Sequence, residues 1–96
     1  MSKFDLGCIN ITADVANKMD ADKDFCHYVA VSLARHENGD WGDLCDSDKR
    51  QNDEAVRTGD DRIFSAYEPD DHPGWRIWII TEWDRSATTV LFPNEY

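Results

Sequence analysis

The spacing of the apolar positions changes near residue 60, and the change separates a helical part of this chain from a strand part. Before residue 60, Phe25, Val29 and Leu33 recur every four positions, which places them on one face of a helix. After residue 60, aromatic and β-branched residues gather in three runs that predict strands. These runs are residues 63–67, 75–82 and 88–92.

Short turns separate the three predicted strands, so we expect an antiparallel meander. Residues 69–74 form a turn by composition, and Pro93 ends the last strand. Residues 75–82 are apolar on both faces, which is typical of a central strand. With two or three helices packed on one face of this C-terminal meander, the predicted fold class is α+β.

An additional N-terminal strand is predicted from the loose alternation of residues 4–11. Thr12 then has the character of an N-cap for a short helix that carries Val15 and Met19. Asp14 falls in the first turn of that helix, where the helix dipole favours a negative charge.

The second helix is predicted to start at a cap formed by Asp22 or Asp24 and to stop at Gly39. Arg35 and His36 fall in its last turn. Because the C-terminal end of a helix favours cations, we interpret His36 as a cation at the helix end.

A turn-rich loop over residues 40–46 leads to a third, mostly polar helix. Asp46 or Ser47 is the predicted cap, the helix runs to about Thr58, and Gly59 is its stop. Its thin apolar face predicts a helix at the surface.

The net charge of the chain limits the kinds of molecule that it is expected to bind. Twenty Asp and Glu stand against ten Lys and Arg, a net charge of -10 on 96 residues. Such a surface repels nucleic acid and attracts cationic protein patches. The hydrophobic fraction of 41% is too high for a disordered acidic tail, so we expect one folded domain over residues 1–96.

The apolar runs and the cysteines of the sequence indicate the same cellular compartment. The sequence has no apolar run long enough to span a membrane and no apolar stretch of a signal peptide at its start. Cys8, Cys26 and Cys45 are an odd number at irregular spacing, which does not form a disulfide framework. We therefore expect reduced thiols, a cytoplasmic location and no membrane partner.

The candidate partner-binding residues are acids grouped along the chain, together with one tryptophan. Eight acids and three bases fall between residues 40 and 61, and a second acidic block follows in the turn after residue 67. Carboxylates spaced along a helix and its flanking loops can approximate DNA phosphates, which lie ~3.4 Å apart on each strand. The predicted set is Asp40, Trp41, Asp43, Asp46, Asp48, Asp53, Glu54, Asp60, Asp61, Glu68, Asp70 and Asp71.

Two alternatives remain open for parts of this surface. Trp41, on a Gly-flanked loop, is either an apolar anchor at an interface or a lid over the small core. The acids are either a docking surface or a solvated face that serves solubility. Glu82, Asp84 and Arg85 flank a hairpin beside the hydroxyls of Ser86, Thr88 and Thr89. They predict either a local salt bridge that closes the turn or a polar ridge that contacts a partner.

Residues that could carry metal or catalytic chemistry form no assembled pattern. His36, Asp40, Asp43 and Cys45 are individually suitable as metal ligands, but the paired close spacing of a zinc site is missing. Nothing in the sequence aims a base at one of the cysteines, and there is no Gly-rich phosphate loop. We expect no enzyme activity, no cofactor and no metal.

Two stretches carry a resemblance to a known family. SLARHENGDWGDL spans residues 32–44 and IWIITEWDRSATTVLFPNEY spans residues 77–96. Together they resemble a family of small uncharacterised bacterial proteins carried on plasmids, phages and other mobile elements, some described as plasmid-related or restriction-system proteins. The resemblance implies a context in which small proteins antagonise host defence and acidic ones imitate DNA.

These observations together predict a non-enzymatic acidic inhibitor from a mobile element. It would bind a basic nucleic-acid-binding complex of the host, of restriction or CRISPR type, by DNA mimicry, without contacting nucleic acid directly. The first alternative is a regulatory or plasmid-maintenance module that binds another protein through its sheet or its aromatic residues. The second is a small-ligand-binding protein or enzyme with a pocket at His36, Trp41 and Tyr67. The oligomeric state is left open.

Overall fold

The computed structural model describes residues 2–96. Its elements follow the chain in the order β1 (Cys8–Ile11), α1 (Ala13–Ala21), α2 (Lys23–Glu37), α3 (Asp46–Thr58), β2 (Ile63–Tyr67), β3 (Ile77–Thr81) and β4 (Ala87–Leu91). Short 3-10 turns occupy Pro73–Trp75 and Pro93–Glu95. Within residues 2–96, none of the helices combines the length and the apolar character that a membrane crossing requires.

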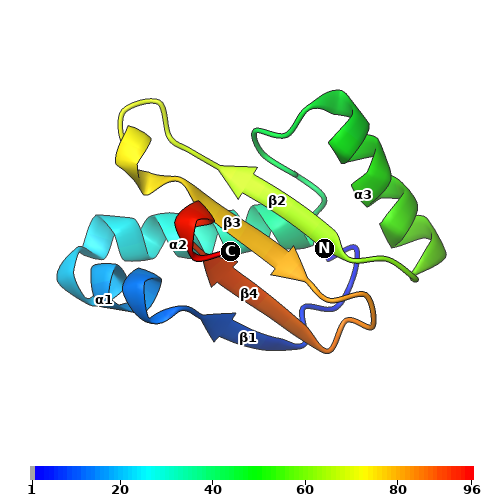
Figure 1. Ribbon diagram of the computed structural model, residues 1–96, viewed down its shortest axis with the longest axis horizontal. Coiled ribbons are helices and arrows are strands. Elements are labelled where there is room, and N and C mark those ends of the chain that lie inside the picture. The colour runs from blue at the N-terminus through cyan, green and yellow to red at the C-terminus, as the bar shows by residue number, and fades with distance from the viewer. Residues whose placement is uncertain (1) are drawn as a thin grey trace.

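The four strands form one sheet in the order β1-β4-β3-β2 (Figure 1). Strands β2, β3 and β4 pair antiparallel, which confirms the predicted meander, and β3 has a neighbour on each side as expected. The additional strand β1 pairs parallel with β4 at the sheet edge. The fold is therefore α+β, as the sequence predicts.

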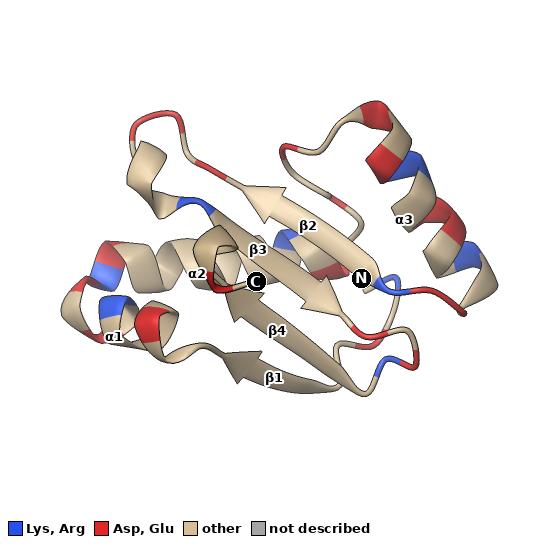
Figure 2. Cartoon of the chain, viewed as in Figure 1, with Lys and Arg blue, Asp and Glu red and all other residues tan. Residues whose placement is uncertain are grey.

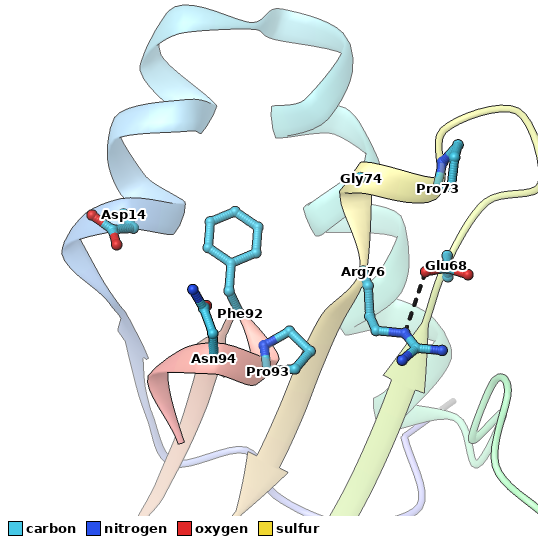
Figure 3. Close-up of a pocket in the computed structure, with 8 residues that line it drawn as sticks. All are labelled: Asp14, Glu68, Pro73, Gly74, Arg76, Phe92, Pro93 and Asn94. Atoms are coloured by element: carbon cyan, nitrogen blue, oxygen red, sulfur yellow. Dashed lines mark ion pairs between the residues drawn. The ribbon is translucent and has the colours of Figure 1, made fainter.

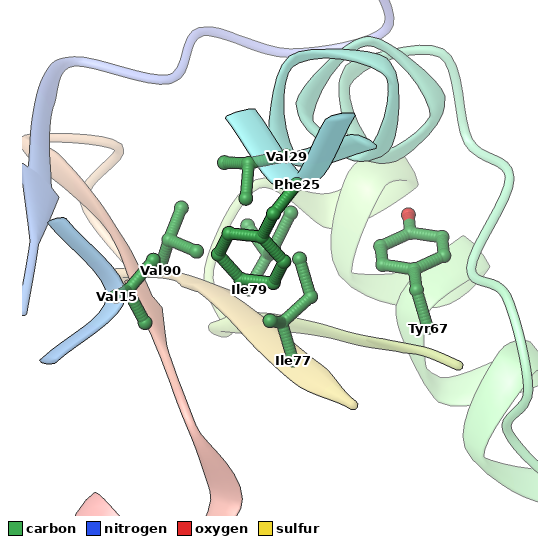
Figure 4. Close-up of a cluster of buried hydrophobic side chains, with 7 residues drawn as sticks. All are labelled: Val15, Phe25, Val29, Tyr67, Ile77, Ile79 and Val90. Carbon is green, nitrogen blue, oxygen red and sulfur yellow. The ribbon is translucent and has the colours of Figure 1, made fainter. Parts of the chain in front are cut away.

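One face of the sheet carries the main core. The alternate residues Ile63, Ser65 and Tyr67 of β2 are fully buried, as are Ile77 and Ile79 of β3. Helices α1 and α2 lie on this face (Figure 1). The main core cluster consists of Val15, Phe25, Val29, Tyr67, Ile77, Ile79 and Val90 (Figure 4).

The beginnings of the helices agree with the sequence only in part. The Asp22 carboxylate accepts hydrogen bonds from the amides of Asp24 and Phe25 at 3.0 and 3.2 Å, which confirms it as the cap of α2. Thr12 occupies the N-cap position of α1, but its hydroxyl donates to Glu95 Oε1 at 2.8 Å instead of capping the helix. Thr12 therefore ties the C-terminal turn to the start of α1.

The predicted caps of α3 are wrong by one or two residues. Cys45 is the N-cap, and Asp46 and Ser47 are already helical. The extended backbone of Cys45 ends the loop, so Asp46 and Asp48 fall in the first turn, where their charges interact with the helix dipole. The helix ends at Thr58, before Gly59 in a left-handed conformation, as predicted.

Helix α3 lies along an edge of the sheet, so only α1 and α2 of the two or three expected helices cover the face. Asn52 of α3 accepts from the Phe64 amide at 3.2 Å and donates to the Phe64 carbonyl at 2.6 Å. The backbone groups of Ala66 in β2 also point away from β3. The Ala66 amide donates to the Trp41 carbonyl, and the Ala66 carbonyl accepts from the Asp43 amide. This edge of the sheet is therefore fully hydrogen-bonded and closed to further strands.

Candidate protein-binding surface

The predicted acids gather on the side of the sheet where β2 forms the edge. Figure 2 shows the acids of α3, of the connection before it and of the turn after β2 on this side. We call this set the acidic edge, and it consists of Asp40, Asp43, Asp46, Asp48, Asp53, Glu54, Asp60, Asp61, Glu68, Asp70 and Asp71. Other acids lie at the α1–α2 turn and in the β3–β4 hairpin (Figure 2).

The predicted anchor Trp41 is not part of this surface. Its side chain is only 4% exposed and packs with Ala55 and Ile63 in a second core cluster. The indole N–H donates to Asp53 Oδ1 at 2.9 Å, which satisfies its one polar group. Burial against α3 makes Trp41 a core lid, so the interface-anchor interpretation is wrong.

Backbone and side-chain hydrogen bonds join the two acidic segments of the chain. The Asp43 carboxylate accepts from the Glu68 amide at 2.9 Å, which holds the loop before α3 against the turn after β2. Glu68 also forms an ion pair with Arg76 at 3.3 Å. The segment around Asp43 and the turn after residue 67 are therefore contiguous in space although far apart in sequence.

Three acids of the acidic edge are paired with arginines. Asp40 accepts from Arg35 at 2.7 Å, and this hydrogen bond lowers the pKa of the Asp40 carboxyl. Glu54 pairs with Arg57 one turn along α3, and Glu68 pairs with Arg76. Exposed pairs of this kind contribute only ~0–1 kcal/mol each, so they orient side chains more than they stabilise the fold.

The other carboxylates of the acidic edge are exposed and form no ion pair with Lys or Arg among residues 2–96. They are Asp43, Asp46, Asp48, Asp53, Asp60, Asp61, Asp70 and Asp71. Their negative charge is not neutralised within the described chain, so it is available to an external cationic group.

Two of the larger surface hollows lie next to the acidic edge. One, of about 360 Å³, is lined by Tyr28, Arg35, Asp43, Glu68, Pro69 and Asp70. The other is an open depression of about 470 Å³ lined by Asp14, Glu68, Pro73, Gly74, Arg76, Phe92, Pro93 and Asn94 (Figure 3). Figure 3 shows the Glu68–Arg76 pair at one side of this depression and Asp14 at the opposite side. Neither lining includes a cysteine, serine or histidine.

His36 is a buried neutral residue and not the predicted cation. It is 0% exposed, and burial lowers its pKa from 6.5 to about 3. The apolar stripe of α2 continues from Phe25 and Val29 to His36, which turns this side chain toward the sheet. The sequence position in the last turn of a helix did not reveal this orientation.

A chain of hydrogen bonds sets the tautomer of His36. The Thr88 hydroxyl donates to the Leu6 carbonyl at 2.7 Å, so Thr81 must donate to Thr88. With its proton used, the Thr81 hydroxyl accepts from His36 Nε2 at 2.9 Å. Neutral imidazole then offers Nδ1 as an acceptor to the Ser65 hydroxyl at 2.6 Å.

This network removes His36 from metal and ligand chemistry. Both ring nitrogens have partners, and the metal hypothesis for His36, Asp40, Asp43 and Cys45 loses its only imidazole. No group of three or more metal-ligating side chains assembles within residues 2–96. Trp41 and Tyr67, expected beside His36 in a ligand pocket, are 4% and 1% exposed and belong to the core.

Arg85 binds backbone carbonyls and does not form the predicted local salt bridge with Glu82 or Asp84. Its guanidinium donates to the carbonyls of Asp61, Trp83 and Ala55 at 2.6, 2.9 and 2.9 Å. Ala55 lies in the last turn of α3, and its carbonyl also accepts from the Gly59 amide at 2.8 Å, so Arg85 is its second donor. Arg85 therefore fastens the β3–β4 hairpin to the C-terminal end of α3.

The outer face of the sheet presents apolar side chains that the site prediction missed. Ile80 is 7% exposed, and Leu91, which lies opposite Trp78 in the β3–β4 pair, is 6% exposed. Trp78 meets Phe64 and Tyr96 edge-on, with ring centroids 5.1 and 5.6 Å apart. The sequence signal was the run of apolar residues on both faces of β3.

Comparison with protein-family models, with curated proteins and with solved structures gives no match to this chain.

Proposed function

We propose that this protein is a non-enzymatic, cytoplasmic inhibitor, encoded by a mobile element, that occupies the nucleic-acid groove of a host restriction or CRISPR complex. The observation that carries the proposal is the acidic edge: eight of its carboxylates are exposed and unpaired with Lys or Arg within the described chain. A groove that grips DNA phosphates with Lys and Arg offers the complementary charge.

The scaffold of the acidic edge supports this role because it is held in place. Asn52 and Asp43 fix α3 and the preceding loop to β2, and Arg85 fixes the end of α3. A surface whose shape is set before binding loses little conformational entropy on docking. The net charge of -10 would also steer the encounter, so association should be fast at low salt and slow at high salt.

The test measures displacement of a fluorescent DNA duplex from purified restriction and CRISPR complexes, at low and high salt. The variant Asp48→Asn/Asp70→Asn/Asp71→Asn removes three exposed charges of the acidic edge. The matched control Asp5→Asn/Asp20→Asn/Asp24→Asn removes three exposed charges elsewhere. We expect the first to weaken displacement by at least about tenfold and the control to change it little.

Equal loss of displacement in both triple variants would mean that only total charge matters, and the acidic edge would not be the binding site. Failure to displace DNA from any of these complexes at low salt would overturn the proposal itself.

A second candidate function follows from the outer face of the sheet. Arg62, Phe64, Trp78, Ile80 and Tyr96 line an aromatic hollow of about 210 Å³ there. A regulatory or plasmid-maintenance module that binds an apolar segment of a partner protein would use this face. The variant Trp78→Ala would then abolish partner binding, whereas the acidic-edge variant would leave it intact.

A further inference from the structure

The two edges of the sheet differ in how far their backbone groups are protected from pairing with a further strand. The β2 edge is covered by Asn52 and the loop before α3. The opposite edge is β1, whose one neighbour among the described strands is β4. Natural sheets protect open edges with charges, prolines or bulges. Residues 6–13, which contain β1, include no charged residue and no proline.

The hydrogen bonds to β4 identify the free groups of β1. The amides of Cys8 and Thr12 donate to the carbonyls of Ser86 and Val90 at 3.0 and 3.1 Å. Since main-chain groups alternate in direction along a strand, Ile9 and Ile11 direct their N–H and C=O groups away from β4. These groups form a template for one more strand.

The side chains of β1 favour an apolar partner. Ile9 is 49% exposed and is one of four exposed large hydrophobic residues among residues 2–96. A second copy of this chain carries net charge -10, so it is repelled wherever acids face acids. Segment 6–13 is uncharged, so it offers an edge at which like charges of two copies do not face each other.

We propose that β1 pairs with β1 of a second copy, antiparallel about a two-fold axis at Ile9. Antiparallel pairing about this axis gives an isologous interface, in which the same residues meet from both sides. Ile9 lies opposite Ile9 of the other copy, and Cys8 lies opposite Asn10. The two sheets become one continuous sheet of eight strands.

This arrangement leaves the acidic edge free. Strand β2 lies at the opposite edge of each sheet, so the dimer carries one acidic edge at each end. The inference does not depend on the proposed function. Because β1 is four residues long, the dimer is expected to dissociate on dilution, and screening of the net charge by salt should strengthen it.

The test measures molecular mass by sedimentation over a range of protein concentrations, at low and high salt. We expect the molecular mass to double as the protein concentration rises. In high salt this doubling should occur at a lower protein concentration. Ile9→Pro removes only an outward amide, and edge strands tolerate proline, so this variant should stay folded and monomeric. Ile9→Lys places like charges opposite each other at the axis and should also stay monomeric.

The matched control is Val31→Lys, because Val31 is a similar residue, 44% exposed, on α2 away from the edge. It should dimerise like the unmodified chain. Hydrogen exchange of the Ile9 amide in the unmodified chain gives a measurement that needs no variant, and its protection should rise with concentration. A monomer at every concentration in high salt, or dimerisation of the Ile9 variants equal to the control, would overturn the proposal.

Discussion

Lowering the pH from 7 to 5 should reduce the free energy of unfolding by about 2 kcal/mol through His36 alone. The side chain is fully buried, its Nε2–H donates to Thr81 and its Nδ1 accepts from Ser65. A second proton on Nδ1 would put a charge in the core and face the Ser65 hydroxyl, which would have to reorient. Burial accordingly lowers the His36 pKa to about 3.

The sign and size follow from proton binding. Below the ordinary pKa of 6.5, the imidazole of the unfolded chain binds a proton that the folded chain excludes. The contribution is fully present above pH 6.5 and is lost as the pH falls toward 3, at about 1.4 kcal/mol per unit. The lowered pKa of Asp40 also reduces stability on acidification, but only near and below its ordinary 3.8.

Urea unfolding at pH 7 and pH 5 measures this effect when the chain is compared with His36→Gln. Glutamine offers a donor and an acceptor in place of the two ring nitrogens but does not titrate. All carboxylates are common to both proteins, so their contribution cancels in the difference. We expect the stability of the unmodified chain relative to the variant to fall by about 2 kcal/mol between these pH values.

Parallel pH profiles for the two proteins would refute this reasoning. An independent check that does not require the variant to fold is the nitrogen NMR spectrum of the His36 ring. It should show a proton on Nε2 and none on Nδ1 throughout this pH range, and a doubly protonated ring at pH 5 would contradict the assigned network.

Two further predictions concern the backbone. Gly42→Ala should prevent folding or cost well over ~3 kcal/mol, because its Cβ would lie 2.0 Å from the Ala66 carbonyl oxygen. Gly59→Ala, with a similar positive φ but open space, should cost only ~1–2 kcal/mol in thermal unfolding, and equal costs would contradict the steric argument. Arg85→Gly suits the φ of 60° and removes the contacts to the α3 carbonyl and the hairpin. It should lower the free energy of unfolding by ~1.5–3 kcal/mol, and an unchanged urea midpoint would contradict the role of Arg85.

Local sequence signals predicted the boundaries of helices and strands well where the chemistry of a single residue sets the boundary. Asp22 caps α2, Gly59 ends α3 and Pro93 follows β4, each because of its side chain or its φ preference. The strand predicted over residues 4–11 was too long at its start. Gly7 has a positive φ of 65°, which bends the chain before β1.

The candidate site was predicted less completely because its residues depend on neighbours far along the chain. Trp41 and Asp53 are both exposed candidates by sequence, yet Trp41 is buried and its indole N–H donates to the exposed Asp53 carboxylate. Arg85 was expected to pair with an acid of its own hairpin, but its partners include the Ala55 carbonyl, thirty residues earlier. No local pattern encodes such pairs.

The sequence by itself determined the net charge, the change from helical to strand spacing and the α+β class, since these depend on composition and local periodicity. Only the tertiary structure decided that His36 is neutral, that Trp41 is buried and that α3 covers one sheet edge while β1 leaves the other open. Burial and hydrogen-bond partners are properties of packed surfaces, and packing brings together residues that the linear order keeps apart.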